Sequence, residues 1–121
     1  MNIRNSLLNL TAILLVLGWP LTAMAHVHTE KTQPADGQTV EQSTKTVEAW
    51  FSGKVSAEWS KIEVSDAAGN RVDTGEVSNG DDPNHLSVGL KPLTSGSYSV
   101  ELNVISGDGH RVKGHFAFNV R

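Results

Sequence analysis

Residues 97–120 read SYSVELNVISGDGHRVKGHFAFNV, and apolar and polar side chains alternate through both halves of this segment. Two sets of apolar residues each share a face: Tyr98, Val100, Leu102 and Val104 in residues 97–105, and Val112, Phe116, Phe118 and Val120 in residues 111–120. A period of two is typical of half-buried antiparallel strands, because successive side chains of a strand point to opposite faces of its sheet. Gly107 and Gly109 allow a tight turn between the two runs. The segment therefore predicts two β-strands joined by a short loop.

The same period recurs upstream, in residues 46–52, 61–65 and 85–90. Clusters of turn-forming residues separate the runs, at 34–37, 66–70, 79–84, 94–96 and 106–110. No segment has the pattern of an amphipathic helix, and there is no internal repeat. About seven short strands predict one all-β domain, either a β-sandwich or a Greek-key barrel.

The N-terminal residues have the order of a secretory signal peptide. Arg4 is followed by an apolar stretch over residues 7–19 and by the small-residue pattern Ala23-Met24-Ala25. The stretch is shorter than the roughly 20 residues of a bilayer-spanning helix, and the A-x-A site argues against an uncleaved membrane anchor. We therefore expect residues 1–25 to be a signal peptide and residues 26–121 to be one exported, soluble domain.

Composition excludes several classes of function. The chain has no cysteine, and its two methionines, Met1 and Met24, both lie in the predicted signal peptide. Thiolate metal sites, haem attachment, cysteine nucleophiles and disulfides are thus excluded, and any bound metal must accept nitrogen and oxygen ligands. The formal net charge is -3 without a basic cluster, so we expect no nucleic acid partner.

His26 becomes the first residue if cleavage follows Ala25. Its α-amine and its imidazole Nδ1 can then close a chelate ring on one metal ion, which no internal histidine can do. The alternative is that the cleavage site merely happens to precede a histidine.

The loop Gly107-Asp108-Gly109-His110 offers a second set of donors. With one residue between them, Asp108 and His110 can point the same way, and a carboxylate beside an imidazole on a tight loop suits half of a metal site. Taken alone the pattern is weak, because Asp-Gly is common turn chemistry and a surface histidine needs no role.

A larger ordered set of residues carries a family resemblance. Its members are His26, Pro34-Ala35-Asp36-Gly37, Phe51-Ser52-Gly53, Val55, Leu93, Gly96-Ser97-Tyr98-Ser99-Val100, Val104, Ser106, Asp108-Gly109-His110, Gly114, Phe116, Phe118 and Val120. With them, residues 26–121 resemble the CopC family of periplasmic copper-binding, or copper resistance, proteins. The resemblance implies a Greek-key, immunoglobulin-like β-barrel that holds one Cu(II) ion per chain. The implied ligands are the amine and imidazole of His26, the carboxylate of Asp108 and the imidazole of His110.

The chemistry of these ligands agrees with copper. Three nitrogens and one carboxylate oxygen in a plane suit the tetragonal preference of Cu(II), whereas Ni(II) could also fit and Zn(II) could bind more weakly. Cu(I) prefers sulfur, and the methionine-rich middle segment of some relatives is absent here, so we expect a protein specific for Cu(II). Gly53 stands where some relatives place a glutamate near the copper, so no outer carboxylate is expected there.

His28 allows an alternative binding mode. In a chain starting His26-Val27-His28, the amine, two deprotonated backbone amides and the third-residue imidazole can wrap Cu(II) or Ni(II). If the chain pairs as a strand from Val27 onward, those amides are already committed. We favour the loop-assisted site, with His28 as a neighbour or auxiliary ligand.

The other candidate residues favour structural roles. We expect His85, at the start of a strand, and His115, on the outer face of the last strand, to be solvated surface histidines. Asp81-Asp82-Pro83-Asn84 lacks the oxygen spacing of a calcium loop and predicts a polar turn. Trp50, opposite Phe51, and Trp59, in a connector after Val55, could stack on sugars, but packing explains them as well.

Three classes of function follow. The first is a periplasmic Cu(II) carrier or buffer in copper homeostasis or resistance, a monomer working beside an inner-membrane protein of the CopD type. The second is a metal-free immunoglobulin-like adhesion or interaction module. The third, a copper-dependent oxidative enzyme, needs open coordination positions that Asp108 would fill. We favour the first and expect no enzymatic activity.

Overall fold

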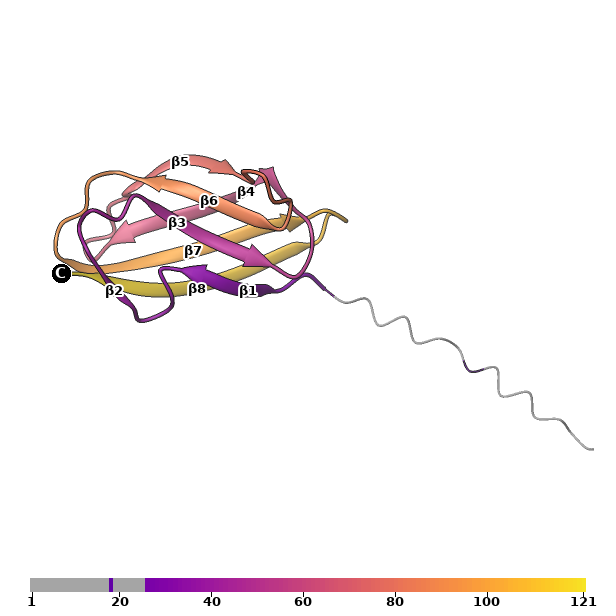
Figure 1. Ribbon diagram of the computed structural model, residues 1–121, viewed down its shortest axis with the longest axis horizontal. Helices are drawn as coiled ribbons and strands as arrows, with labels where there is room; N and C mark the ends of the chain where they lie inside the picture. Colours follow the sequence, from indigo (N-terminus) through magenta and orange to yellow (C-terminus); the bar gives the residue numbers. More distant parts are fainter. Residues whose placement is uncertain (1–17, 19–25) are drawn as a thin grey trace, which may run out of the picture.

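Eight β-strands form two four-stranded sheets that pack face to face (Figure 1). This computed structural model describes Gly18 and residues 26–121. The strands are β1 (Thr29–Gln33), β2 (Thr39–Val40), β3 (Thr46–Phe51), β4 (Val55–Asp66), β5 (Asp73–Ser78), β6 (His85–Leu90), β7 (Gly96–Ser106) and β8 (Arg111–Val120). Within the described residues there is no helix long and apolar enough to cross a bilayer. The predicted signal peptide, residues 1–25, lies outside the described part apart from Gly18, so the domain boundary stays a prediction.

The strand order is that of an immunoglobulin-like Greek key. The first sheet has the order β1-β3-β6-β5 and the second has the order β2-β8-β7-β4. Apart from the short β2, which pairs in parallel with β8, every pairing is antiparallel. In immunoglobulin nomenclature, the first sheet contains strands A, B, E and D (β1, β3, β6 and β5). It faces strands C, F and G (β4, β7 and β8) of the second sheet. At the start of β7, the Tyr98 hydroxyl donates to the carbonyl of Thr94 at 2.7 Å, which is the tyrosine corner of such domains. The predicted all-β, immunoglobulin-like sandwich is therefore confirmed.

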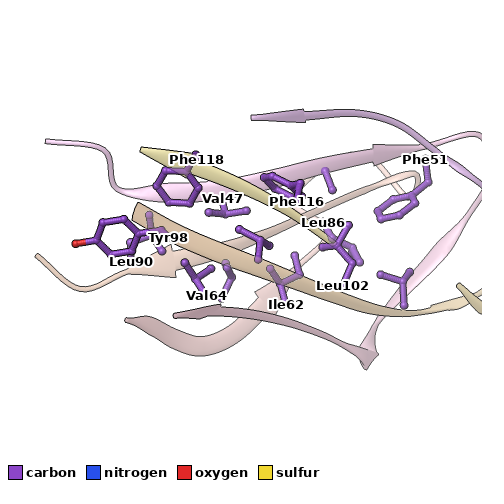
Figure 2. Close-up of a cluster of buried hydrophobic side chains, with 14 of the residues drawn as sticks. Val47, Phe51, Ile62, Val64, Leu86, Leu90, Tyr98, Leu102, Phe116 and Phe118 are labelled. Carbon is purple, nitrogen blue, oxygen red and sulfur yellow. The ribbon is translucent and has the colours of Figure 1, made fainter. Parts of the chain in front are cut away.

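The core lies between the sheets and consists mainly of residues that alternation placed on inner faces, together with Val55 and Leu93 (Figure 2). Tyr98 and Phe118 lie on neighbouring strands and stack with their ring centroids 5.4 Å apart. Val112, also predicted on this face, is only partly buried, because it lies near the open end of the sandwich. The long β7–β8 pairing, which runs from Gly96–Val120 to Ile105–Arg111, carries the predicted metal-binding loop at its tip.

Two expectations about β4 are corrected, namely that the strand covers only residues 61–65 and that Trp59 lies in a connector before it. The strand begins at Val55, so Trp59 lies within it and not in a connector, and 68% of Trp59 is exposed. The pairing of β4 with β7 shifts register between Ser56 and Lys61. Buried Ser60 fills the gap by accepting the N–H of Ile105 through its hydroxyl at 2.9 Å. The bulge explains why alternation becomes clear only from Lys61 onward.

Candidate metal centre

The turn between β7 and β8 is held closed by backbone hydrogen bonds. The amide of Ser106 donates to the carbonyl of His110 at 2.8 Å, and the amide of Gly109 donates to the carbonyl of Ser106 at 2.9 Å. Gly109 has a φ of 88°, a left-handed conformation that glycine adopts without strain. The short closed turn leaves the side chains of Asp108 and His110 at its exposed tip.

Asp108 and His110 form a hydrogen-bonded pair. Nδ1 of His110 lies 3.0 Å from Oδ2 of Asp108, with the two side chains 50% and 62% exposed. The hydroxyl of buried Ser106 donates to Oδ1 of Asp108, and the amide of His110 approaches the same oxygen at 3.3 Å. These contacts, first the Ser106 hydroxyl and then His110, lower the pKa of Asp108 to about 2. The carboxylate is therefore ionised across the physiological pH range and leaves Nε2 of His110 as the free ring nitrogen.

Residues 26–28, which we call the N-terminal arm, precede β1 and are held to the domain at Val27 and His28. The amide of His28 donates to the hydroxyl of Ser52 at 3.0 Å, and the amide of Ser52 donates to the carbonyl of His28 at 2.9 Å. Val27 packs against the core, where a Cβ on Gly53 would meet its Cγ2 at 2.9 Å. That separation is closer than real Cβ atoms approach, so the absent side chain of Gly53 is what lets Val27 lie here.

The arm and the β7–β8 turn lie at the same end of the sandwich (Figure 1). The imidazoles of His26 and His110 meet edge to face, with ring centroids 5.5 Å apart and an interplanar angle of 77°. The two segments share one support, because the amide of Gly107 donates to the carbonyl of Lys54 at 2.8 Å, two residues after Ser52. A hollow of about 260 Å³ between Val27, Lys54, Gly107 and Asp108 leaves this end open to solvent.

The predicted ligands His26, Asp108 and His110 are thus neighbours, while the auxiliary candidate His28 is exposed on the arm. In this structure no three histidine or carboxylate side chains among residues 26–121 converge on one point. Both oxygens of Asp108 are engaged, Oδ2 by Nδ1 of His110 and Oδ1 by the hydroxyl of Ser106. Two imidazoles on one metal ion hold their centroids about 4–6 Å apart when each metal–nitrogen bond is about 2 Å long. The separation of 5.5 Å between the rings of His26 and His110 lies within this range.

Two supporting residues escaped prediction from the sequence, although both belong to the resembling motif. The hydroxyl of Ser52 accepts the N–H of His28, and the hydroxyl of Ser106 donates to the carboxylate of Asp108. Ser106 precedes Gly-Asp-Gly-His, and a serine at a turn commonly bonds the following backbone. That local signal could have identified Ser106. No comparable signal links Ser52 to His28, because the two meet only through the fold.

The prediction for His85 is wrong. Its side chain is 13% exposed, with Nε2 3.0 Å from Oε1 of Glu48 and Nδ1 3.1 Å from the carbonyl of Asn79. The ring centroids of His85 and Trp50 are 4.8 Å apart. Nζ of Lys31 lies over the Trp50 ring, 4.8 Å from its centroid. His85 pairs with Trp50 across β3 and β6, and this neighbour covers its ring. The position of His85 at the start of a strand does not reveal that contact.

Two further structural expectations are met. His115 is exposed on β8, opposite Glu101 of β7. Residues 81–84 form a polar turn in which the amide of Asn84 donates to Oδ1 of Asp82 at 2.8 Å.

The fold and this end of the molecule define a small immunoglobulin-like sandwich with a histidine–carboxylate cluster at its tip. The model of the CopC domain matches residues 29–121. The chain therefore belongs to the CopC family, as its sequence motifs predicted. This is a family of copper-binding proteins and not of enzymes.

Named relatives agree with this assignment. The chain is 31% identical over 110 residues to the copper transport protein CutJ of Bacillus subtilis, a match that covers 89% of this chain. The match spans only 20% of the length of CutJ. Protein YobA of Escherichia coli is 30% identical over 99 residues, which are 80% of each chain.

Solved structures show the same fold. CopC from Methylosinus trichosporium OB3b superposes with a TM-score of 0.73 at 32% identity, covering 78% of this chain and 93% of that one. PcoC, a methionine-rich copper resistance protein from Escherichia coli, has a TM-score of 0.70 at 22% identity, covering 80% of this chain and all of that one.

Proposed function

We propose that this chain is a periplasmic Cu(II)-binding protein that carries or buffers copper, one ion per chain, in copper homeostasis or resistance. The ion is held by the α-amine and imidazole of His26, exposed by signal cleavage, together with the carboxylate of Asp108 and the imidazole of His110. The observation that supports this most directly is the approach of His26 to within 5.5 Å of His110, although the two residues are 84 positions apart in the sequence.

The donor set explains the choice of ion. Three nitrogens and one oxygen suit the tetragonal geometry of Cu(II), which also heads the affinity order of divalent metals. Residues 26–121 contain no cysteine and no methionine, so the soft ligands that Cu(I) prefers are missing from that range. The ionised Asp108 adds a negative charge to a site whose other donors are neutral when they bind.

Exposure of the site supports a carrier. The candidate ligands Asp108 and His110 are at least half exposed, so an incoming protein can reach a bound ion without any opening of the core. The match to one fifth of a copper transport protein supports a role beside a larger transport protein. We propose an inner-membrane protein of the CopD type as that partner and a monomer as the form that meets it.

The test compares two forms of the exported chain. One form begins at His26, and the other carries one extra residue before His26. We expect tight one-to-one Cu(II) binding by the first in an isothermal titration, and loss of most of the affinity by the second, because it has no α-amine at the chelating position. His115→Ala, in an exposed histidine on the outer face of β8, serves as the control and is expected to bind as the unaltered chain does. Equal binding with and without the extra residue would refute the proposal.

A further inference from the structure

The segment His26-Val27-His28 offers the ion a competing arrangement. The α-amine, the amide nitrogens of residues 27 and 28 and the imidazole of His28 can form one plane of four nitrogens, a geometry that Cu(II) and Ni(II) both accept. This arrangement would not use Asp108 or His110 at all. Some feature of the fold must therefore decide between the two arrangements.

Ser52 engages the backbone that the competing arrangement needs. The hydroxyl of Ser52 accepts the N–H of His28 at 3.0 Å, and the amide of Ser52 donates to the carbonyl of His28 at 2.9 Å. An amide nitrogen that keeps its proton in a hydrogen bond is not a metal ligand. Making the amide nitrogen of His28 a ligand would remove its proton and so break the hydrogen bond to the hydroxyl of Ser52.

Packing acts in the same direction. Val27 lies against the core and over Gly53, with the Cβ position of Gly53 only 2.9 Å from its Cγ2. To turn the amide of Val27 toward an ion at the α-amine, the chain would have to lift this side chain off the sandwich. The arm is thus fixed at Val27 and at His28, and only His26 is left to turn toward the β7–β8 turn.

We propose that Ser52 is a positioning residue that determines how the metal is bound. By holding the backbone of His28, it prevents the four-nitrogen arrangement and directs the ion to Asp108 and His110. This inference rests on the proposed function, because it concerns the same ion and the same free amine of His26. The hydroxyl of Ser52 is the group that matters, so threonine can replace serine and alanine cannot.

The experiment uses the exported chain that begins at His26, with Ser52→Ala, Ser52→Thr and Ser60→Ala as variants. Ser60 is the matched control, because its buried hydroxyl also accepts a backbone N–H, that of Ile105 in β7 at 2.9 Å, and not one of the arm. Cu(II) is added, and electron paramagnetic resonance and visible absorption report the number of nitrogen donors. We expect a three-nitrogen, one-oxygen signature for the unaltered chain, Ser52→Thr and Ser60→Ala. Ser52→Ala should shift to a four-nitrogen signature with its absorption band at shorter wavelength.

Second substitutions identify the ligands. In the unaltered chain, His110→Ala should weaken Cu(II) binding at least about tenfold, and His28→Ala should change it little. In the Ser52→Ala background, the two effects should exchange, so that His28→Ala becomes the costly change. A Ser52→Ala variant that keeps the three-nitrogen signature and its dependence on His110 would overturn the inference and leave the proposed function standing.

Amide hydrogen exchange tests the same inference without metal. The amide of His28 should be protected in the unaltered chain and in Ser52→Thr, and should exchange freely in Ser52→Ala. Free exchange in the unaltered chain would overturn the inference, as would a four-nitrogen copper signature there. Absence of Cu(II) binding by the unaltered chain would instead overturn the proposed function, and the inference with it.

Discussion

At the scale of single residues, Ser106 connects the core to the candidate metal centre. Its hydroxyl donates to Oδ1 of Asp108 and accepts the N–H of His110 at 3.1 Å, while Ser106 itself is 3% exposed. A rigid residue thus fixes the orientation of an exposed carboxylate. Outer partners of this kind orient metal ligands and are worth about 10–100-fold in affinity.

We therefore predict that Ser106→Ala weakens Cu(II) binding by about 10–100-fold while leaving the fold intact. Without the hydroxyl, Asp108 is free to rotate and must be ordered when the ion binds. Isothermal titration gives the affinity, and circular dichroism gives the fold. Ser97→Ala, which removes the hydroxyl that donates to Asn119 at the opposite end of β7 from Ser106, is the control. An unchanged affinity for Ser106→Ala would contradict the prediction.

The pH dependence of binding is also set by single residues. The contacts of Asp108 lower its pKa to about 2, so this carboxylate stays ionised across the physiological pH range. The α-amine and the imidazoles must instead be free of protons to bind, and a chain-terminal amine ordinarily has a pKa of about 8. Nitrogen donors and not Asp108 should therefore control the pH profile.

Accordingly, Cu(II) affinity should fall steeply between about pH 8 and pH 5, and Asp108→Asn should lower the affinity without changing the steepness. Titrations at several pH values measure both quantities. A profile that flattens in Asp108→Asn would show that the carboxylate, and not the nitrogens, is the group that takes up the proton.

At the scale of the strands, β5 is held by a buried carboxylate at its first residue. Asp73, whose side chain is 1% exposed, accepts the amides of Val64 at 2.8 Å and Gly75 at 2.9 Å and the guanidinium of Arg71 at 2.7 and 2.9 Å. Burial alone would raise the pKa of Asp73, but the hydrogen bonds from Arg71, Val64 and Gly75 outweigh it and hold the pKa below its ordinary value. The carboxylate therefore stabilises the fold while it is ionised.

Asp73→Asn should lower the free energy of unfolding by about 2–3 kcal/mol at neutral pH, because an amide cannot accept all of these bonds. Because the folded pKa is lowered, the contribution is complete above the ordinary carboxyl pKa of about 4 and disappears as pH falls through the folded value. Urea unfolding at pH 7 and near pH 2 measures it, and the gap between Asp73→Asn and the unaltered chain should narrow in acid. A gap of equal size at both pH values would contradict the role of the charge. Asp108→Asn is measured in parallel, because the pKa of this exposed carboxylate is also lowered. The comparison distinguishes its effect on stability from that of Asp73.

Strands differ in how well the sequence predicts them, and the reason is burial. Alternation identified β3, β6, β7 and β8, since β3, β6 and β7 each bury one face in the core and β8 buries Phe116, Phe118 and Val120 there. The edge strand β1 and the two-residue β2 are largely exposed, so no apolar pattern marks them, and β5 is defined by Asp73 more than by hydrophobic residues. For the candidate site, the types and spacing of Asp108 and His110 were only a weak signal, and the resemblance to the CopC family supplied the proposed ligand set of His26, Asp108 and His110. The contacts of Ser52 were not predictable, because they depend on how the arm lies across the loop after β3.

At the scale of the whole molecule, the candidate centre lies between a segment of the first sheet and a segment of the second sheet. The arm leads into β1 of the first sheet, while Asp108 and His110 lie between β7 and β8 of the second sheet. A metal ion bound by both segments would thus join the two sheets at one end of the sandwich. Unfolding would have to release it, so binding should stabilise the fold as a whole.

We predict that saturating Cu(II) raises the melting temperature of the chain that begins at His26. At a free Cu(II) concentration 100 times the dissociation constant, the gain in unfolding free energy is about 2.7 kcal/mol, provided that the unfolded chain binds weakly. Thermal unfolding followed by circular dichroism, with and without the ion, measures the gain, and a chelator should reverse it. The form with one extra residue before His26 should gain little, because its arm holds the ion poorly. If that form were stabilised to the same degree, the ion would be held without the α-amine, and the connection between the two sheets would have to come from other ligands.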